Sequence, residues 1–583
     1  MLDRRHLAVV LVASIASLAL GTSPTPFWDE DEPRFAAIAG GMVSTGDWIV
    51  PMYNGELAVD KPVLMHWAMA AARTLCGESE VAARLPAALA TLLTALALLW
   101  AGARWFDATT GTVAALAFVG SLLVGVEAHA ATPDAILTCL TAWATVLFAE
   151  PLVAHRGSLP RLSWRRAAVV GGLMGLAVLC KGPIGVVGPL AVVLPWTWWL
   201  AVRGRLAADD AAGDMATRIR RLAATTLPAA WDTVRTCRPL VMVAALVAVA
   251  APWYVAVSLR TDGAWLHGFF FIHNVGRFVA PMEKHGGSVL LHPLAMLVGF
   301  YPWSCFLPLA AAVAVWRVGR RSEPSASRDP LGLVLLWIAV WVGGFSLSAT
   351  KLPNYVLPAY PAAALLVAAI GVGAATAGRW PHPRWMAAGV ASLALGGLIT
   401  AGVILLADRL GAHGAAPAAV VGLVPLVAAA CLWHWRREPL RAIAALAVTG
   451  LAYTGLMVGP AGACAARANA LPALVQEAHR HAGGRARLGA FPQITPNVVY
   501  YAGGRVAAWR EHEREEAVRF LTSGPDAVVL VPEDRLAELA AGLPAQIGVI
   551  GRGRPLFREQ DFLLVGTRSH TSQRTAGLGS TSR

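Results

Sequence analysis

The chain has few charged residues for its length. Asp, Glu, Lys and Arg make up 14% of its 583 residues, whereas 56% of the residues are hydrophobic. Soluble domains carry about 25% charged and about 45–50% apolar residues, so a large soluble protein is excluded. Windows of about 20 nearly uncharged residues recur, which is the length that crosses the core of a bilayer. The sequence predicts a polytopic α-helical membrane protein.

Paired cysteines and internal repeats are also lacking. The seven Cys residues are scattered, form no Cys-x-x-Cys motif, and mostly lie in or near apolar segments. Free Cys in such places behaves as a small hydrophobic residue, so we expect neither a disulfide framework nor a cysteine-based metal site. No internal repeat is evident, which disfavours a transporter built from inverted repeats.

Positive charge exceeds negative charge by 13, but it is not gathered into one binding stripe. Arg-rich loops alternate along the chain with loops that hold acids and isolated cations, and the Arg-rich loops fall on the side of Arg4 and Arg5. This is the positive-inside pattern of membrane proteins. We therefore expect contact with membrane lipids and not with nucleic acid.

About thirteen spans are expected within residues 1–460, the transmembrane domain. The basic start and first apolar run are also typical of a cleaved signal peptide, but the alternation of loops favours an uncleaved span. Thirteen crossings place the N-terminus in the cytoplasm and the C-terminus outside. The other spans are expected at about 82–102, 111–129, 133–152, 167–181, 183–202, 240–258, 291–316, 331–349, 355–377, 386–407, 416–434 and 441–460.

The loop after the first span concentrates charge, and we expect residues 27–80 to form a first outer catalytic loop. Within it, residues 33–46 and 63–77 show partial helical amphipathicity, which predicts interfacial helices along the membrane surface. From about residue 461, short β-type runs alternate with polar helical stretches. This pattern predicts a small extracytoplasmic α/β domain over 461–568, followed by a Ser/Thr-rich, disordered tail at 569–583.

Acidic residues on the outer side are the first candidates for chemistry. Asp31 and Glu32 belong either to a merely solvated loop or to a site in which carboxylates near the membrane act as general bases. Asp134 begins a span, where an acid either complements the helix dipole or belongs to a functional site. Both interpretations remain open from the residues alone.

Cationic and aromatic residues recur on the same outer side. Individually, Lys61 suits a snorkelling position and Tyr355 an interfacial anchor. Their shared location favours binding of an anionic lipid phosphate, because Lys and Arg both suit phosphate groups. The candidate substrate-binding residues are Arg34, Lys61, Lys181, Arg277, Lys351 and Tyr355.

Several motifs in this order resemble a known family. The first loop contains DEPRF, STGDW, NG, DKP and ARLP, and ATPDAIL, KG, HNVGRF and SATKLPNYVLPAYP follow. Together, to about residue 361, they resemble the bacterial lipid A aminoarabinose transferases and their relatives among the protein-mannosyltransferase-like GT-C glycosyltransferases. The later spans and the outer domain are similar in layout only.

The resemblance implies a GT-C fold and particular roles. Asp31 would be the key acid near the acceptor and Asp134 a second one, while Lys61, Arg277 and Tyr355 would hold the phosphate of an undecaprenyl-type carrier.

The chain departs from the family pattern at two positions. Phe35 replaces a Tyr and so removes a hydroxyl. Asp60 replaces a Glu at a position implicated in metal binding, which moves the carboxylate by about one bond. A divalent metal at Asp60 is the one cofactor that the resemblance raises.

The expected function is transfer of a sugar from a polyprenyl phosphate to an extracytoplasmic acceptor, with a lipid A-like glycolipid favoured. The sugar would be 4-amino-4-deoxy-L-arabinose or another pentose or hexose. The alternatives are protein O-mannosylation and, in another class, a flippase for lipid-linked sugars. A flippase predicts charges midway along the spans, whereas the informative charges here lie at the outer ends. We expect a multi-pass protein of the bacterial inner membrane.

Overall fold

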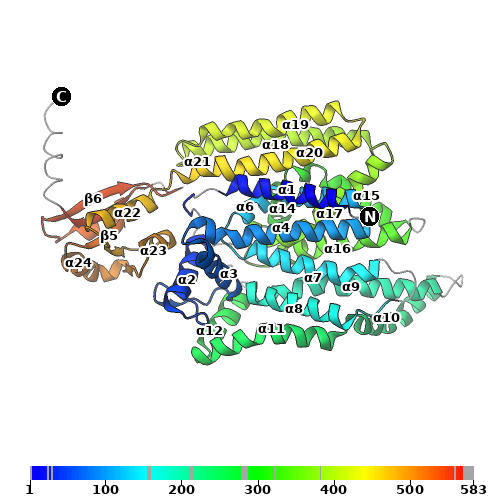
Figure 1. The fold of residues 1–583 in the computed structure, drawn as a ribbon, viewed down its shortest axis with the longest axis horizontal. Coiled ribbons are helices and arrows are strands. Elements are labelled where there is room, and N and C mark those ends of the chain that lie inside the picture. Colours follow the sequence, from blue (N-terminus) through cyan, green and yellow to red (C-terminus); the bar gives the residue numbers. More distant parts are fainter. Residues whose placement is uncertain are drawn as a thin grey trace.

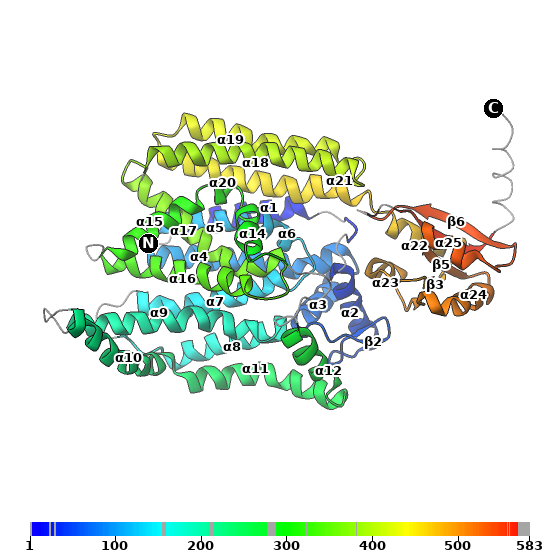
Figure 2. The ribbon, with the colours of Figure 1, turned by 180° about the vertical axis from the view of Figure 1, so that it is seen from behind.

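The computed structural model describes residues 3–22, 25–27, 31–153, 159–208, 215–276, 287–320, 324–380, 382–556, 558 and 560–568. Most of the chain forms long helices that run side by side (Figure 1, and from behind in Figure 2). The bundle contains α1 (Arg4–Gly21), α4 (Glu80–Trp105), α5 (Ala108–Val119), α6 (Leu122–Ala128), α7 (Asp134–Val153), α8 (Trp164–Lys181), α9 (Ile184–Ala208), α11 (Pro239–Arg260), α14 (Leu291–Gly299), η2 (Trp303–Cys305), α15 (Leu307–Gly319), α16 (Ser325–Ser346), η3 (Pro353–Ala359), α17 (Tyr360–Thr376), α18 (Pro383–Arg409), η4 (Ala416–Gly422), α19 (Leu423–His434), α20 (Pro439–Leu456), η5 (Met457–Ala461) and α21 (Gly462–Ala466).

Fewer helices meet the length and composition of a membrane span than the thirteen expected. Among the described residues, ten helices are long and apolar enough to cross a membrane, and the α5–α6 pair, bent by 67°, makes eleven. The other two expected spans also form helices. However, α8 includes Arg165, Arg166 and Lys181, and residues 291–316 are divided among α14, η2 and α15. The chain is a multi-span membrane protein.

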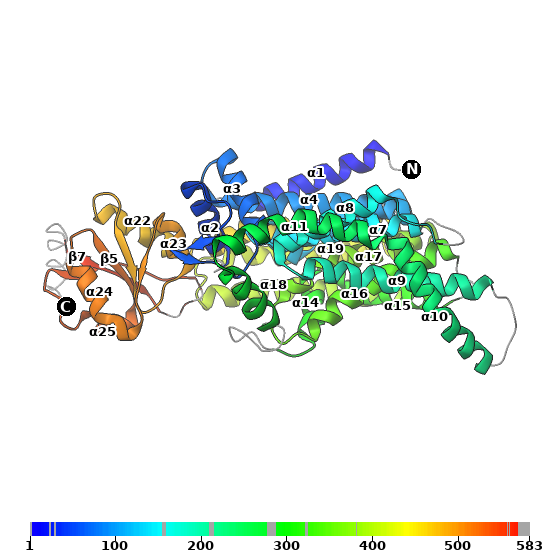
Figure 3. The same cartoon turned by 90° about the horizontal axis from the view of Figure 1, so that it is seen from below.

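The first loop folds at one end of this bundle, beside the C-terminal domain, whereas the N-terminus and α10 (Met215–Cys237) lie toward the other end (Figures 1 and 3). Two helices form in this loop, as the sequence predicts: α2 (Asp31–Thr45) and α3 (Leu64–Cys76). Both bury an apolar face together with α12 (Ala264–His267) and η1 (Gly268–Gly276). The loop is therefore a packed unit.

A short hairpin in the same loop was not predicted. Strands β1 (Met52–Tyr53) and β2 (Glu56–Leu57) pair antiparallel. Asn54 and Gly55 at its tip have φ of 51° and 88°. Two positive φ values are what a two-residue type I′ turn requires, and Asn-Gly is its favoured sequence.

The C-terminal domain is a five-stranded sheet with the strand order β4-β3-β5-β7-β6. Strands β3 and β4 and strands β3 and β5 pair parallel, and β7 is antiparallel to β5 and β6. The central β5 reads AVVLVP and its first five residues are buried, because apolar clusters pack on both faces of this mixed sheet. The predicted tail at 569–583 lies outside the described residues. The domain contains α22 (Leu471–His481), β3 (Arg487–Ala490), α23 (Pro496–Ala502), β4 (Ala507–Ala508), η6 (Glu511–Glu513), α24 (Arg514–Thr522), β5 (Ala527–Pro532), η7 (Glu533–Arg535), α25 (Leu536–Ala540), β6 (Ile547–Gly553) and β7 (Phe562–Thr567).

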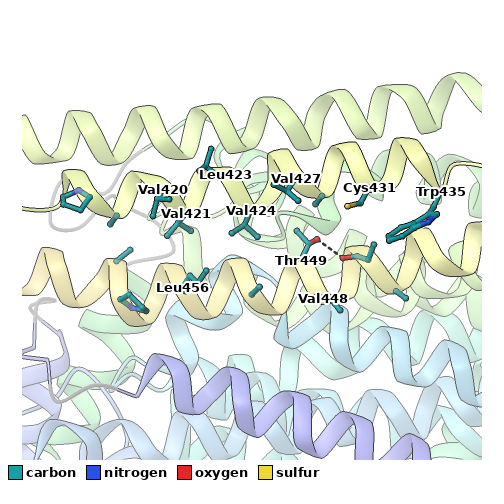
Figure 4. A pocket seen from close by; sticks show the side chains of 18 of the residues that line it. Val420, Val421, Leu423, Val424, Val427, Cys431, Trp435, Val448, Thr449 and Leu456 are labelled. Carbon is teal, nitrogen blue, oxygen red and sulfur yellow. Dashed lines mark hydrogen bonds between the residues drawn. The ribbon is translucent and has the colours of Figure 1, made fainter.

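A large apolar groove of about 1080 Å³ lies between α19 and α20 (Figure 4). Val420, Val427 and Val448 line it and are exposed on the surface of the bundle. The Thr449 hydroxyl donates to the Ala445 carbonyl at 2.7 Å and so satisfies its polarity within the helix. Of the lining residues only Arg441 is charged. The groove is suited to lipid acyl chains and not to chemistry.

Candidate active site

A buried ion pair joins two helices at the bundle end that carries the first loop. Asp134 begins α7 and Lys181 ends α8, so the antiparallel course of these helices brings them together. The Lys181 Nζ lies 2.5 Å from Asp134 Oδ1, and Asp134 is only 4% exposed. Gly182, with φ of 77°, ends α8 directly after the lysine. The same Nζ lies 5.1 Å from the centre of the Tyr355 ring.

The first loop supplies a second charged group through Asp60 and Lys61. Asp60 is buried, and Arg34 Nη2 of α2 lies 3.5 Å from its Oδ1. Burial alone raises the pKa of the Asp60 carboxyl, but attraction by Lys61 and Arg34 outweighs it, so the pKa is lowered. Lys61 Nζ lies 5.9 Å from the centre of the Phe35 ring.

These two groups line one cavity of about 190 Å³. Two carboxylates and two lysines face it, and two further cations, Arg34 and Lys351, lie beside it. Lys351 is buried and donates to the Ser348 carbonyl. An excess of cations at a small cavity suits an anionic ligand such as phosphate. The lining residues are Asp60, Lys61, Asp134, Leu137, Lys181, Ile184, Phe269, His273, Phe345, Ser348, Thr350 and Tyr355.

Glu32 lies in a different setting. Its carboxylate is fully buried and accepts from Arg84 at 2.9 and 3.1 Å and from the Ala131 backbone N–H at 2.8 Å. Arg84, the arginine of the ARLP motif, also donates to the Thr25 carbonyl at 2.9 Å. This arrangement favours a structural role for Glu32, which fastens α2 to α4. The catalytic role expected from the sequence stays a prediction that the geometry does not support.

Asp31 and Arg277 are the remaining predicted residues. Asp31 is the first residue of α2 and is exposed. Arg277 lies outside the described residues and follows η1, whose His273 does line the cavity. The roles predicted for both stay predictions.

His66 is a feature that the sequence analysis missed. It lies on α3, is 1% exposed, and neither ring nitrogen has a hydrogen-bond partner among the described residues. Burial, opposed by the attraction of Asp60, lowers the pKa of His66 to about 4. A neutral imidazole therefore stands close to Asp60 at neutral pH. The sequence around His66 is an apolar helical face, and it does not indicate that the imidazole lies near Asp60.

The residues around Asp60 do not fit a resident metal ion. Among the described residues, no three His, Cys, Asp or Glu side chains converge in a way that could hold one. The Asp60 carboxylate is attracted instead by Arg34 and Lys61, and these cations oppose a divalent ion. No step of the chemistry below is assigned to a metal.

Lowering the pH from 6.5 to 4 should reduce the stability of the protein. The pKa of His66 is about 4 in the folded chain and 6.5 ordinarily, so the unfolded state takes up the proton first. Stability is complete above pH 6.5 and is lost by up to about 3 kcal/mol as pH falls to 4. The stabilisation that comes from the lowered pKa of the Asp60 carboxyl is present above its ordinary pKa of 3.8 and is lost only below it, so it does not affect this pH range. Melting temperature against pH checks this, and the His66→Phe variant should give a flatter curve; equal slopes would contradict it.

Part of the sequence is similar to a known protein family. Residues 60–208 match the model of a family described as dolichyl-phosphate-mannose-protein mannosyltransferase. The matched segment begins at Asp60 and includes Lys61, Asp134 and Lys181, the four charged residues that line the cavity. The segment that holds the charged residues of the cavity is thus similar to this mannosyltransferase family.

The more specific resemblance is to enzymes named undecaprenyl phosphate-alpha-4-amino-4-deoxy-L-arabinose arabinosyl transferase. The relative from Aeromonas salmonicida (strain A449) is 30% identical over 349 residues, which are 58% of this chain and 55% of the relative. The relative from Pseudomonas aeruginosa (strain LESB58) is 29% identical over 365 residues, or 62% of this chain and 59% of the relative. The chain thus spans little more than half the length of these curated relatives.

Solved structures show the fold over the whole chain. The crystal structure of ArnT from Cupriavidus metallidurans bound to undecaprenyl phosphate superposes with a TM-score of 0.71. The match covers 97% of this chain and 98% of that one at 22% identity. The predicted resemblance to the aminoarabinose transferases and the GT-C fold are both confirmed.

Proposed function

We propose that this protein is a glycosyltransferase that moves a sugar from undecaprenyl phosphate, or another polyprenyl phosphate, to an extracytoplasmic acceptor. The observation that carries the proposal is the cavity where Lys61 and Lys181 stand beside Asp60 and Asp134. The names of the relatives support a 4-amino-4-deoxy-L-arabinose donor. The resemblance of the motifs to the lipid A aminoarabinose transferases supports a lipid A-like acceptor. Another pentose or hexose would use the same phosphate contacts.

The reaction breaks the bond between the anomeric carbon and the phosphate oxygen and forms a bond to an acceptor oxygen. The polyprenyl phosphate leaves with the bonding electrons, so negative charge grows on its phosphate. Lys61 and Lys181, fixed at the cavity wall, stabilise that charge. The Tyr355 ring, 5.1 Å from the Lys181 ammonium, adds a cation–π contact that helps to hold it in place.

The acceptor decides whether a base is needed. A hydroxyl acceptor must lose its proton, and Asp31 at the start of α2 is the proposed base. A phosphate acceptor is already ionised, and Asp31 would then position the acceptor or an amino sugar. Asp134 keeps the Lys181 ammonium in place through their 2.5 Å contact.

The proposed location is a bacterial inner membrane, with the first loop and the C-terminal domain in the periplasm. The positive-inside pattern of the loops supports this orientation. So does the position of the C-terminal domain beside α2 and α3, at the bundle end away from the N-terminus (Figure 1).

Protein O-mannosylation is the second candidate, because residues 60–208 match the mannosyltransferase family. It uses the same class of donor and a Ser or Thr hydroxyl as acceptor. The two candidates differ only in the acceptor, so one assay separates them.

Sugar transfer in proteoliposomes tests the proposal. Labelled undecaprenyl-phosphate sugars are offered with either lipid A or a Ser/Thr peptide. Label should move to lipid A, and Lys61→Ala should lower the rate about 10²–10³-fold because a charge-stabilising donor is lost. Asp31→Asn should also abolish transfer to a hydroxyl, whereas Arg73→Ala, a cation of α3 that does not line the cavity, should retain it.

The other possible outcomes each select an alternative function. Label on the peptide would select protein mannosylation. Label that only changes leaflet, with neither Lys61→Ala nor Asp31→Asn affected, would contradict a transferase and favour a flippase.

A further inference from the structure

A polar groove of about 650 Å³ lies where the first loop meets the C-terminal domain. One wall is the hairpin tip, with Asn54 and Glu56, and the other carries arginines of the C-terminal domain. Neither the cavity chemistry nor the relatives' names assign it a role. The residues that matter are Asn54, Glu56, Arg485, Arg487, Arg505 and Trp509.

The groove is held open by a clamp between its walls. The Asn54 side chain donates to the Val506 carbonyl at 2.9 Å and accepts from the Val506 N–H at 2.9 Å. This double contact fixes the hairpin against the residue just before β4, the edge strand of the sheet. The Phe27 N–H also donates to the Tyr501 hydroxyl, which in turn donates to Glu80 at 2.9 Å. The walls are therefore preorganised.

Two of the three arginines have no carboxylate partner among the described residues. Arg487 is neutralised by Asp526, at 2.7 and 3.1 Å. Arg485 donates only to the Gly503 carbonyl, and Arg505 forms no ion pair within the described part of the chain. The Glu56 carboxylate offsets one of these two guanidinium charges, and the remaining excess of positive charge in the groove favours an anionic ligand.

Both arginines lie directly against glycine backbone. A Cβ atom at Gly504 would lie 2.4 Å from Arg485 Nη2, and one at Gly55 would lie 3.0 Å from Arg505 Cζ. Any larger residue would push either guanidinium away. The glycines thus give the two cations their positions in the groove.

The other lining groups suit a sugar. The Glu56 carboxylate can accept hydrogen bonds from sugar hydroxyls, and Trp509, whose ring lies 5.0 Å from that of Phe520, supplies an apolar floor. Guanidinium groups bind phosphate with paired N–H donors. We propose that this groove binds the phosphate-bearing sugar headgroup of the acceptor glycolipid. The identity of this ligand as the acceptor rests on the proposed function.

The groove and the cavity are both lined by residues of the first loop. Lys61 follows Asn54 by only seven residues, and a fully extended chain of that length spans at most about 25 Å. A headgroup bound at the hairpin is thus delivered to the same outer end of the bundle as the cavity.

Binding measurements on the full-length protein in nanodiscs test the proposal without requiring transfer. The probes are bisphosphorylated lipid A, the same lipid without phosphates, and glucosamine 1-phosphate. The Arg485→Ala/Arg505→Ala variant should bind bisphosphorylated lipid A at least tenfold more weakly and leave binding of the dephosphorylated lipid unchanged. Arg480→Ala is the matched control, because Arg480 is an exposed arginine of α22 outside the groove.

An unchanged affinity in the double variant, or an equal loss in Arg480→Ala, would overturn the proposal. Glucosamine 1-phosphate that binds as tightly as lipid A would overturn the assignment to a lipid-linked ligand. If the wild type transfers sugar but the double variant keeps its affinity for lipid A, the role of the groove is refuted and the proposed function is not. If the wild type binds lipid A through these arginines but never transfers sugar, the proposed function is refuted and the binding site is not.

Discussion

Replacing Lys181 by Met should lower the rate of sugar transfer about 10²–10³-fold. Its ammonium lies at the cavity wall, 2.5 Å from Asp134 and over the Tyr355 ring, where it cannot rotate away from the ligand. A fixed donor that meets growing negative charge contributes about this factor to catalysis. The initial rate in proteoliposomes, with donor and acceptor saturating, measures the effect.

The single substitution also leaves Asp134 buried and unpaired, which costs about 3–5 kcal/mol of stability. The Asp134→Asn/Lys181→Met variant separates the two effects because it removes both charges. We expect its melting temperature to return close to that of the wild type while transfer stays at least 100-fold low. If activity returned with stability, Lys181 would be only a structural partner of Asp134.

Replacing Arg84 by Met should cause the largest loss of stability in the first loop. The substitution leaves the fully buried Glu32 carboxylate without its cation, and the Ala131 N–H is then its one donor among the described residues. An uncompensated buried charge costs about 3–5 kcal/mol. Thermal unfolding in detergent should show the loss, and transfer should fall with the folded fraction.

A surface ion pair in the same loop region is the control. Arg73 lies 2.6 Å from Glu78, but both side chains are partly exposed, so Arg73→Met should cost less than about 1 kcal/mol. The Glu32→Gln/Arg84→Met variant should recover most of the stability. An Arg84→Met protein that melts like the wild type would show that this bridge does not hold the loop.

The sequence was most informative where the physical signal is local. Long apolar windows indicate the spans, and helical amphipathicity indicates α2 and α3. The charges that matter also stand at the ends of predicted spans, which is why Asp134 and Lys181 were both candidates. Their antiparallel helices make the contact almost unavoidable.

Contacts between distant segments could not be predicted in this way. Glu32 meets Arg84 and Ala131 at separations of 52 and 99 residues, and Asn54 meets Val506 at a separation of 452. No periodicity or composition reports such pairings. For this reason the sequence analysis assigned Glu32 to catalysis although it forms a buried ion pair with Arg84. The arginine groove was missed for the same reason.

The position of His66 and the metal expected at Asp60 are two further cases in which the three-dimensional contacts could not be predicted from the sequence. The resemblance raised a metal at Asp60, yet the approach of Arg34 and Lys61 to that carboxylate is visible only in three dimensions. The count of spans differed for a local reason, because charged residues in α8 and the breaks between α14 and α15 interrupt otherwise apolar stretches.

The central claim is that the cavity lined by Lys61 and Lys181 binds the phosphate of a polyprenyl carrier. The most direct test compares the binding of undecaprenyl phosphate and undecaprenol to the wild-type protein in nanodiscs. We expect the phosphate to bind at least tenfold more tightly, since one charge-assisted hydrogen bond contributes about that factor. This preference should shrink in the Asp134→Asn/Lys181→Met variant. Equal affinity of the wild type for both lipids would contradict the account.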